Sequence, residues 1–352
     1  GGADNDTLTG GAGNDTFNVD SGTDTITDLT TGDILNVSSG ATATITNVTS
    51  FTATGSSSNS GSVTISTDNS SGGTVDMSSA SGNYTLNGQG AIDTLTGGGG
   101  NDIISGGTGA DALTGGGGDD TLTGGSDNDN MTGGTGNDTF KVDSGTDTVS
   151  DLTTGDILVV SSGATANATN ISAFVATSST SNSGTANLTA ATGGGSIDVG
   201  NSTTGSYNLT GLSGADTLKG NSNNDIINAG NGNDTIDGRG GNDQINAGGG
   251  DDTIIVSSAG HGNSDSMDGG SGTDTLQLSS GSHSFTSDGS LQNIQTITLN
   301  SSGTTINLTG QSESLTITGA AGSDIITTGS GDDTISGEGG ADTITGSGGA
   351  DV

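Results

Sequence analysis

Aspartate residues recur at every ninth position over a long stretch of the sequence, residues 88–159. The aspartates of this series are Asp93, Asp102, Asp111, Asp120, Asp129, Asp138, Asp147 and Asp156. Carboxylate oxygens are the ligands that a hard cation such as calcium prefers. Glycines precede many of these aspartates, and glycine permits turns in which several backbone carbonyl oxygens point toward one place. The spacing therefore predicts a series of cation sites built from carboxylate and carbonyl oxygens.

A short strand is expected to follow each of these turns and to hold it in place. The three residues after the aspartate alternate polar, apolar, polar, which is the pattern of a strand with one buried face. In successive repeats the apolar residue is Leu95, Ile104, Leu113, Leu122, Met131, Phe140, Val149 and Leu158. One apolar side chain per nine residues cannot form a core alone, so the turn-and-strand units must stack on one another.

Two nonapeptides, residues 115–123 and 133–141, fit the pattern Gly-Gly-x-Gly-x-Asp-x-U-x, in which U is a large apolar residue. This pattern resembles the calcium-binding repeat of RTX proteins. The resemblance implies two nonapeptides per coil, with calcium held between the turns of neighbouring coils. The expected fold class is all-β, a parallel β-roll or β-solenoid with calcium-binding nonapeptide turns, interrupted by Ser/Thr-rich β segments.

The aspartates at position 6 of the nonapeptides are the predicted ligands of multiple calcium ions. They are Asp6, Asp15, Asp93, Asp102, Asp111, Asp120, Asp129, Asp138, Asp216, Asp225, Asp234, Asp243, Asp252, Asp274, Asp324, Asp333 and Asp342. For four other position-6 aspartates, which lack the full glycine set, a structural role is at least as well supported; these are Asp24, Asp33, Asp147 and Asp156. Tyr84 and Tyr207 also stand at position 6, where we expect each to plug the turn that would otherwise hold a calcium ion.

Acidic residues at other positions of the repeat lead to weaker expectations. Asp4 and Asp127 replace the glycine of position 4, which predicts a distorted turn or an extra carboxylate ligand. The acidic residues at position 5 are expected to be solvent-facing charges; they are Asp119, Asp251 and Asp332.

The two histidines give little support for transition-metal or catalytic chemistry. Counting in nines places His283 at position 6, and neither His261 nor His283 has a partnered motif, so a turn-filling role is favoured. The sequence has no Gly-x-Ser-x-Gly elbow, no His-Glu-x-x-His motif and no cysteine. We therefore expect no enzymatic activity.

The composition rules out a conventional globular core. Only 26% of the residues are hydrophobic, 70 are glycine, and 40 acidic residues face 3 basic ones for a net charge of -37. Such a chain is expected to be disordered without metal, so that folding and calcium binding form one event. Nucleic acid is excluded as a partner because the only basic side chains are Lys141, Lys219 and Arg239. No apolar run is long enough to span a membrane.

Tandem modules organise the chain, since residues 13–43 recur almost unchanged as residues 136–166. In the segment 20–35 we expect a β-hairpin or lid that closes a roll. The Ser/Thr-rich tract 36–77 predicts a differently built β segment, because the nine-residue register slips between Asp33 and Asp93.

Seven segments follow from this pattern. Calcium β-rolls are predicted at 1–35 and 88–158, each with a closing segment, at 211–277, and at 319–352, where the last roll is truncated. Ser/Thr-rich β segments are predicted at 36–87 and 159–210, and a metal-poor β-solenoid at 278–318. Both ends of the sequence fall inside a nonapeptide, so we expect a longer array.

Modest calcium sites in such number favour an extracellular location, because calcium is scarce in the cytosol. The expected protein is therefore a secreted structural protein of the bacterial cell surface, an S-layer or extracellular filament subunit. Its expected partners are other copies of itself and cell-surface polysaccharide. The alternatives are the calcium-stiffened stalk of a large RTX adhesin and, less well supported, the C-terminal repeat region of a secreted RTX enzyme or toxin.

Overall fold

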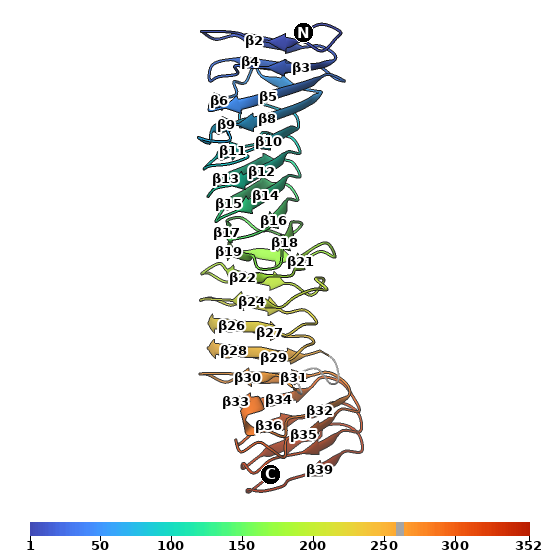
Figure 1. The fold of residues 1–352 in the computed structure, drawn as a ribbon. Coiled ribbons are helices and arrows are strands. Elements are labelled where there is room, and N and C mark those ends of the chain that lie inside the picture. The colour runs from blue at the N-terminus through green and yellow to red at the C-terminus, as the bar shows by residue number, and fades with distance from the viewer. Residues whose placement is uncertain (258–263) are drawn as a thin grey trace. The chain divides into compact units, whose positions relative to one another are not determined.

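The computed structural model describes residues 1–257 and 264–352. Within these ranges the chain consists of short β-strands and one turn of 3-10 helix, η1 (Asp288–Ser290). All strand pairs within each part of the described chain are parallel, as in the stacked coils of Figure 1. The predicted fold class, an all-β parallel β-solenoid, is confirmed.

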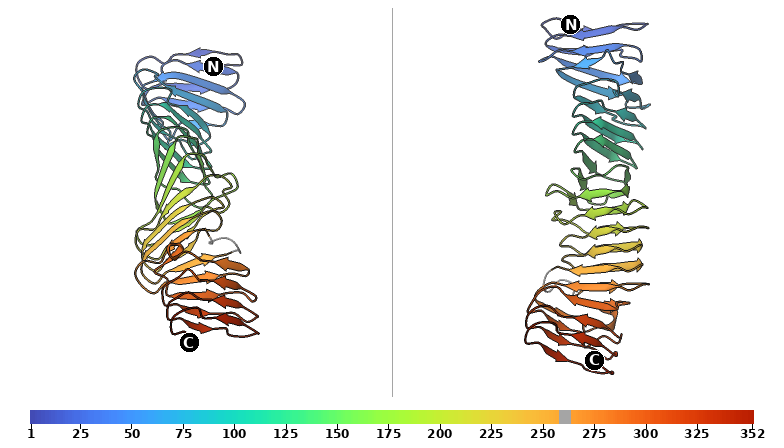
Figure 2. Two further views of the ribbon diagram at one scale, coloured as in Figure 1. Left: turned by 60° about the horizontal axis from the view of Figure 1, so that its bottom comes forward. Right: turned by 180° about the vertical axis from the view of Figure 1, so that it is seen from behind.

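The described chain forms two compact units. The first unit comprises Gly1–Thr169 and Ser179–Thr185, and the second comprises Asn170–Ser178 and Ala186–Val352. In each unit, strands from alternate nonapeptides belong to different sheets, so that successive coils add strands to the same sheets. Figure 2 shows this layering from two further sides, with the strands of the second unit in light green to red.

Strands of the first unit form three sheets. Sheet 1 has the order β1 (Thr7–Leu8), β3 (Thr23–Ile26), β5 (Thr42–Val48), β8 (Ser62–Thr67), β10 (Tyr84–Asn87), β12 (Ile103–Thr108), β14 (Thr121–Ser126), β16 (Thr139–Val142), β18 (Ile157–Val160) and β21 (Ser181–Asn182). Sheet 2 has the order β6 (Ser50–Thr52), β9 (Thr74–Asp76), β11 (Thr94–Thr96), β13 (Ala112–Gly117), β15 (Asn130–Thr135), β17 (Thr146–Val149) and β19 (Thr165–Ile171). Sheet 3 has the order β2 (Thr16–Val19), β4 (Ile34–Val37) and β7 (Ser58–Asn59).

Strands of the second unit are arranged in the same way. Sheet 4 has the order β22 (Thr185–Ala190), β24 (Tyr207–Thr210), β26 (Ile226–Asn231), β28 (Gln244–Gly249), β30 (Ser266–Asp268) and β33 (Leu291–Gln292). Sheet 5 has the order β20 (Ala173–Val175), β23 (Ser196–Asp198), β25 (Thr217–Lys219), β27 (Thr235–Asp237), β29 (Thr253–Val256), β31 (Thr275–Leu278), β34 (Thr296–Leu299), β36 (Thr316–Thr318) and β38 (Thr334–Ser336). Sheet 6 has the order β32 (Ser282–Ser284), β35 (Thr305–Asn307), β37 (Ile325–Thr327) and β39 (Thr343–Thr345).

The core is a stack of the position-8 side chains, as the apolar spacing predicts. Leu95 lies in register with Leu113, and Leu113 with Met131, and all three are fully buried. On the facing sheet the same relation joins Ile104, Leu122 and Phe140. The strands alternate exposed and buried residues because every second side chain of a strand points to the same face. The stacking fixes the coil at two nonapeptides and thereby places the turns of successive coils side by side.

The expected hairpin or lid at residues 20–35 is not formed. Strand β3 pairs in parallel with β1 and β5, and β4 pairs in parallel with β2. The segment keeps the alternation of a strand with one buried face, so it continues the coil and does not fold back on it.

The Ser/Thr-rich tract 36–77 was also expected to be built differently, and this prediction is wrong. Strands β5 and β8 pair in parallel with each other and with the strands of the rolls on either side. Its inward residues, such as Ile45 and Ile65, continue the core. The slip of register arises because the coils here lengthen to between 20 and 24 residues, with loops at residues 53–57 and 68–73. The segment boundaries drawn from the sequence stay predictions.

Candidate metal centre: two ladders of buried carboxylates

The position-6 aspartates of successive coils are joined by one repeated hydrogen bond. The backbone N–H of Asp102 donates to Oδ1 of Asp120 at 2.7 Å, and that of Asp120 donates to Oδ1 of Asp138 at 2.8 Å. Each acceptor lies one coil, 18 residues, further along the chain. We call such a row a carboxylate ladder. A second ladder of the first unit, beside sheet 2, joins Asp93, Asp111, Asp129 and Asp147 with distances of 2.8 to 3.1 Å.

All seventeen aspartates predicted as calcium ligands lie in such ladders. In the second unit the ladders are Asp216–Asp234–Asp252–Asp274 and Asp225–Asp243–Asp265. Shorter pairs occur in both units: Asp6–Asp24 and Asp15–Asp33 in the first, and Asp324–Asp342 and Asp333–Asp351 in the second. Asp265 and Asp351 were not among the predicted ligands. Asp265 follows a coil of 22 residues and therefore falls outside a count in nines from Asp252.

Burial leaves one carboxylate oxygen of most ladder members without a hydrogen-bond partner. Fourteen of the seventeen predicted ligands are buried, with at most 3% of their surface exposed, and only Asp6, Asp15 and Asp342 are partly exposed. In the described chain Oδ2 has no hydrogen-bond partner in Asp93, Asp111, Asp120, Asp129, Asp147, Asp216, Asp234, Asp243, Asp252, Asp274 and Asp333. Oδ2 of Asp24 also has none, but it lies 3.6 Å from the amino group of Gly1. A buried, unpaired carboxylate oxygen is costly, so these oxygens require a cation or a proton.

The glycines that begin each nonapeptide leave space directly beside these oxygens. A Cβ atom added to Gly115 would collide with Oδ2 of Asp120 and with the carbonyl oxygen of Gly133 in the next coil. A Cβ atom on Gly124 would lie 2.6 Å from Oδ2 of Asp129 and 2.9 Å from Oδ2 of Asp147. Two carboxylates of neighbouring coils therefore face one small space whose wall is glycine backbone.

Carboxylates alone cannot complete a calcium site here. No group of three or more His, Cys, Asp or Glu side chains comes together anywhere in the described ranges. Calcium takes six to eight oxygen ligands, including backbone carbonyls. Paired aspartates surrounded by carbonyl-rich glycine turns fit a calcium ion, whereas the donor set does not fit a site made of nitrogen and sulfur ligands.

The electrostatics of the ladders also indicate a missing positive charge. The pKa of Asp120 and that of Asp147 are raised to about 7. The larger cause is burial, and the smaller is the negative charge of neighbouring ladder members. The same two causes raise the pKa of Asp243 to about 8. A carboxyl whose charged form is so disfavoured gains strongly from a nearby cation.

These shifts predict a specific response of the metal-free protein to pH. Because folded-state pKa values lie above the unfolded value of 3.8, the folded state binds more protons, and its stability falls as pH rises toward 8. In EDTA we expect far-UV circular dichroism to show β structure returning as pH is lowered from 8 to 5. A β signal that is weaker at pH 5 than at pH 8 would contradict the raised pKa values of the buried aspartates.

We call residues 28–33 and 151–156 the closing segments. They end their ladders with hydrogen bonds to protein groups. Oδ2 of Asp156 accepts hydrogen bonds from the N–H and the hydroxyl of Thr153, at 2.7 and 3.0 Å. The carboxylate of Asp151 accepts the N–H groups of Gly133 and Gly134, one coil away. Asp33 with Thr30, and Asp28 with Gly10 and Gly11, repeat this arrangement in the first copy. Asp33 and Asp156 thus accept hydrogen bonds from protein groups at both oxygens, and their structural role stays a prediction. Oδ2 of Asp147 has no hydrogen-bond partner, and Oδ2 of Asp24 lies 3.6 Å from the amino group of Gly1.

Removal of one of these capping hydroxyls tests the closing segment. In Thr153→Val the Oδ2 atom of Asp156 keeps the backbone N–H but loses the hydroxyl donor. We expect the unfolding free energy to fall by about 1 kcal/mol. Urea unfolding at saturating calcium measures the change, with the exposed Thr154→Val as the matched control. Equal effects of the two substitutions would count against the cap.

The aspartate that lies one coil, 18 residues, after each tyrosine is also satisfied by the protein. Tyr84 donates its N–H to Oδ1 of Asp102, whose Oδ2 accepts the N–H of Gly98 at 2.6 Å. Tyr207 and Asp225 repeat this pattern. Both tyrosine rings are buried, and the Tyr84 hydroxyl donates to the carbonyl oxygen of Ser81 across the turn. Tyr84 and Tyr207 begin β10 and β24, in register with Val63 and Ala186, so that each plugs a calcium turn stays a prediction. Both oxygens of Asp102 and of Asp225 have protein donors.

Residues at positions 4 and 5 keep the turns in shape. Asp127 adopts a φ of 78°, the left-handed conformation of the glycine that it replaces, so its turn is retained. Asp119 is exposed, but it also accepts the N–H of Asn137 in the next coil, so it bridges coils as well as facing solvent. Asp251 and Asp332 make equivalent bonds to Thr273 and Ala350.

The histidine predictions have different outcomes. His283 is not in a turn: it lies in β32, in register with Ile306, and is buried in the core. Its Nε2 atom bonds with the carbonyl oxygen of Ser279 at 2.9 Å. His261 lies outside the described residues.

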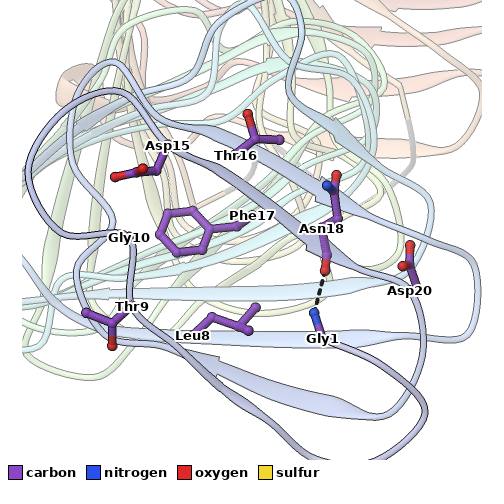
Figure 3. A pocket seen from close by; sticks show the side chains of 9 residues that line it. All are labelled: Gly1, Leu8, Thr9, Gly10, Asp15, Thr16, Phe17, Asn18 and Asp20. Atoms are coloured by element: carbon purple, nitrogen blue, oxygen red, sulfur yellow. Dashed lines mark hydrogen bonds between the residues drawn. The ribbon is translucent and has the colours of Figure 1, made fainter.

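One cavity of the first unit is unrelated to the ladders' chemistry. It has a volume of about 460 Å³ and opens between the first strands, where Leu8 and Phe17 line it (Figure 3). Gly1 closes part of it by donating its amino group to the carbonyl oxygen of Asn18. It is the open face of the core at the first coil.

A family model for the RTX calcium-binding nonapeptide repeat matches the chain at several places. The matched residues are 1–26, 81–113, 114–149, 202–236, 220–254, 259–281 and 318–352. Among curated proteins, none gives a significant match. No helix in the described ranges is long and apolar enough to cross a membrane.

Proposed function

Because these matches cover more than half of its length, the chain belongs to the family of RTX calcium-binding nonapeptide-repeat proteins, and we propose that it is a secreted structural protein of the bacterial cell surface. In this proposal it is a subunit of an S-layer or an extracellular filament, and it acts structurally and not as an enzyme. Its folding and its association with further copies depend on calcium.

The observation that carries the calcium dependence is the row of unpaired Oδ2 atoms in each ladder. Asp93, Asp111, Asp129 and Asp147 would hold calcium in the first unit, with the carbonyl-lined glycine turns between them. Calcium, when bound, supplies the positive charge that lets buried carboxylates of neighbouring coils stay ionised. The protein's own part is to hold Oδ1 of each aspartate with an N–H and so aim Oδ2 at the glycine turn.

The structural role is supported by the repetition of one module. Residues 13–43 recur almost unchanged as residues 136–166, and the tyrosine and the closing-segment aspartate recur as Tyr84/Tyr207 and Asp28/Asp151. Repetition of a complete unit lengthens a protein without adding a new chemical site. Neighbouring copies of the chain could pair through strand edges or through the Ser/Thr-rich outer faces.

Negative-stain electron microscopy of the purified chain, with and without millimolar calcium, tests the proposal. Ordered sheets or filaments that form with calcium and not with magnesium are the expected result. Separate rods with calcium would instead favour the stalk of a large adhesin. Identical images with and without calcium would overturn the dependence on metal.

A further inference from the structure

A groove on the outer face of the second unit is lined by eight residues, of which four have amide side chains. It crosses the four neighbouring strands β26, β28, β30 and β33 and has a volume of about 360 Å³. Four strands at ordinary spacing span about 14 Å. The amides are exposed and come from every second residue of these strands, so they point away from the core; they are Asn228, Gln244, Asn246 and Gln292.

These four amide groups make no hydrogen bond to any described residue, whereas amides elsewhere in the unit are used internally. Asn221 donates to the carbonyl oxygen of Gly205, and Gln311 donates to two backbone carbonyl oxygens. Each free amide offers two donors and an acceptor. A row of such groups in one groove is therefore available to a ligand that can both donate and accept hydrogen bonds.

The rest of the groove narrows the choice of ligand. Ile226, at one end, is 42% exposed and provides an apolar surface among the amides. Asp268 is the only charged residue in the lining, and its Oδ1 atom is held by Asn293 and by the N–H of Gly270. In a chain of net charge -37 this groove is nearly neutral. An anionic ligand would be repelled by the chain, and a cationic one would find a single carboxylate.

We propose that this groove binds an uncharged glycan. Pairs of neighbouring sugar hydroxyls match the donor and acceptor of an amide, and the C–H face of a sugar ring can pack on Ile226. The site is particular to the second unit, because the first module has Ser105 and Thr121 where the second has Asn228 and Gln244. The proposal does not rest on self-assembly.

The double variant Asn228→Ser, Gln244→Thr tests the site and installs residues that the first module already carries at these positions. The probes are dextran, laminarin and soluble starch in native gels at saturating calcium, with hyaluronan as the anionic control. Gln277→Thr is the matched variant, since it removes an outward amide from β31, on the other sheet of the same unit. Circular dichroism with calcium confirms that all three proteins fold alike.

We expect at least one uncharged polysaccharide to retard the native protein, with no retardation by hyaluronan. The double variant should bind that polysaccharide at least tenfold more weakly, and Gln277→Thr should bind it as the native protein does. The proposal is wrong if none of the uncharged polysaccharides retards the native protein or if the double variant is retarded equally. It is also wrong if the double variant loses self-association in sedimentation but keeps glycan binding, because the face would then be a contact between copies of the chain.

Discussion

Chelation of calcium with EDTA at neutral pH is expected to unfold both units of the protein. Without a cation the ladders would place charged, buried carboxylates next to one another in successive coils, as in Asp111, Asp129 and Asp147. Each unpaired Oδ2 atom would lack any compensating donor. Few other interactions can offset this cost, since only 26% of the residues are hydrophobic and the chain has no disulfide. Loss of calcium should therefore remove most of the folding free energy.

Far-UV circular dichroism and hydrodynamic radius measure this effect. We expect a loss of β signal and an expanded chain in EDTA, and full recovery when calcium is restored. Magnesium should not restore the fold, because it demands octahedral geometry and gives up its water reluctantly. A compact chain with unchanged β signal in EDTA at neutral pH would contradict the role given to the ladders.

The substitution Gly115→Ala is expected to destabilise the first unit strongly. The added Cβ would overlap Oδ2 of Asp120 and the carbonyl oxygen of Gly133, and the latter belongs to backbone that cannot move without disturbing the next coil. We expect the unfolding free energy at saturating calcium to fall by about 3 kcal/mol, in the upper range of overpacking effects. Calcium titration followed by circular dichroism should also show a higher midpoint.

The same turn supplies the control. Gly117→Ala adds a methyl group two residues away, where the nearest atom outside its chain neighbours is the hydroxyl oxygen of Thr135 at 3.2 Å. Gly117 does not have a positive φ, so alanine is compatible with its backbone. Its substitution should change stability by less than about 1 kcal/mol. If the two alanine variants are equally stable, the space beside Asp120 is not what the fold needs.

Strictly periodic features were predictable from the sequence. Asp120 and Leu122 repeat in phase with their neighbours, and in a solenoid a sequence period becomes a spatial stack. Counting in nines was enough to predict the ladder members in coils of regular length and the residues of the core. The counting failed where coil length changes, and this is why His283 was assigned to a turn and was found in the core.

Contacts between coils were harder to predict. Asp28 and Asp151 bind glycine N–H groups one coil away, so their role depends on a register that a single nonapeptide does not define. The recurrence of Asp-Leu-Thr-Thr-Gly-Asp at residues 28–33 and 151–156 is the signal that could have identified them. The tract 36–77 was misjudged for a related reason, since its loss of glycine turns suggested a new architecture although its inward residues still fit the existing core.

The closing segments have a consequence for how such a gene can change. Asp151, Thr153 and Asp156 complete their ladder within the module, so no calcium site of that ladder needs a residue from the following copy. The two copies also share almost identical sequence over residues 13–43 and 136–166, which is a substrate for unequal recombination. Gain or loss of one repeat would alter the length of the protein by a whole module while the remaining sites keep their neighbours. Length is therefore a trait that this architecture lets selection adjust in discrete steps.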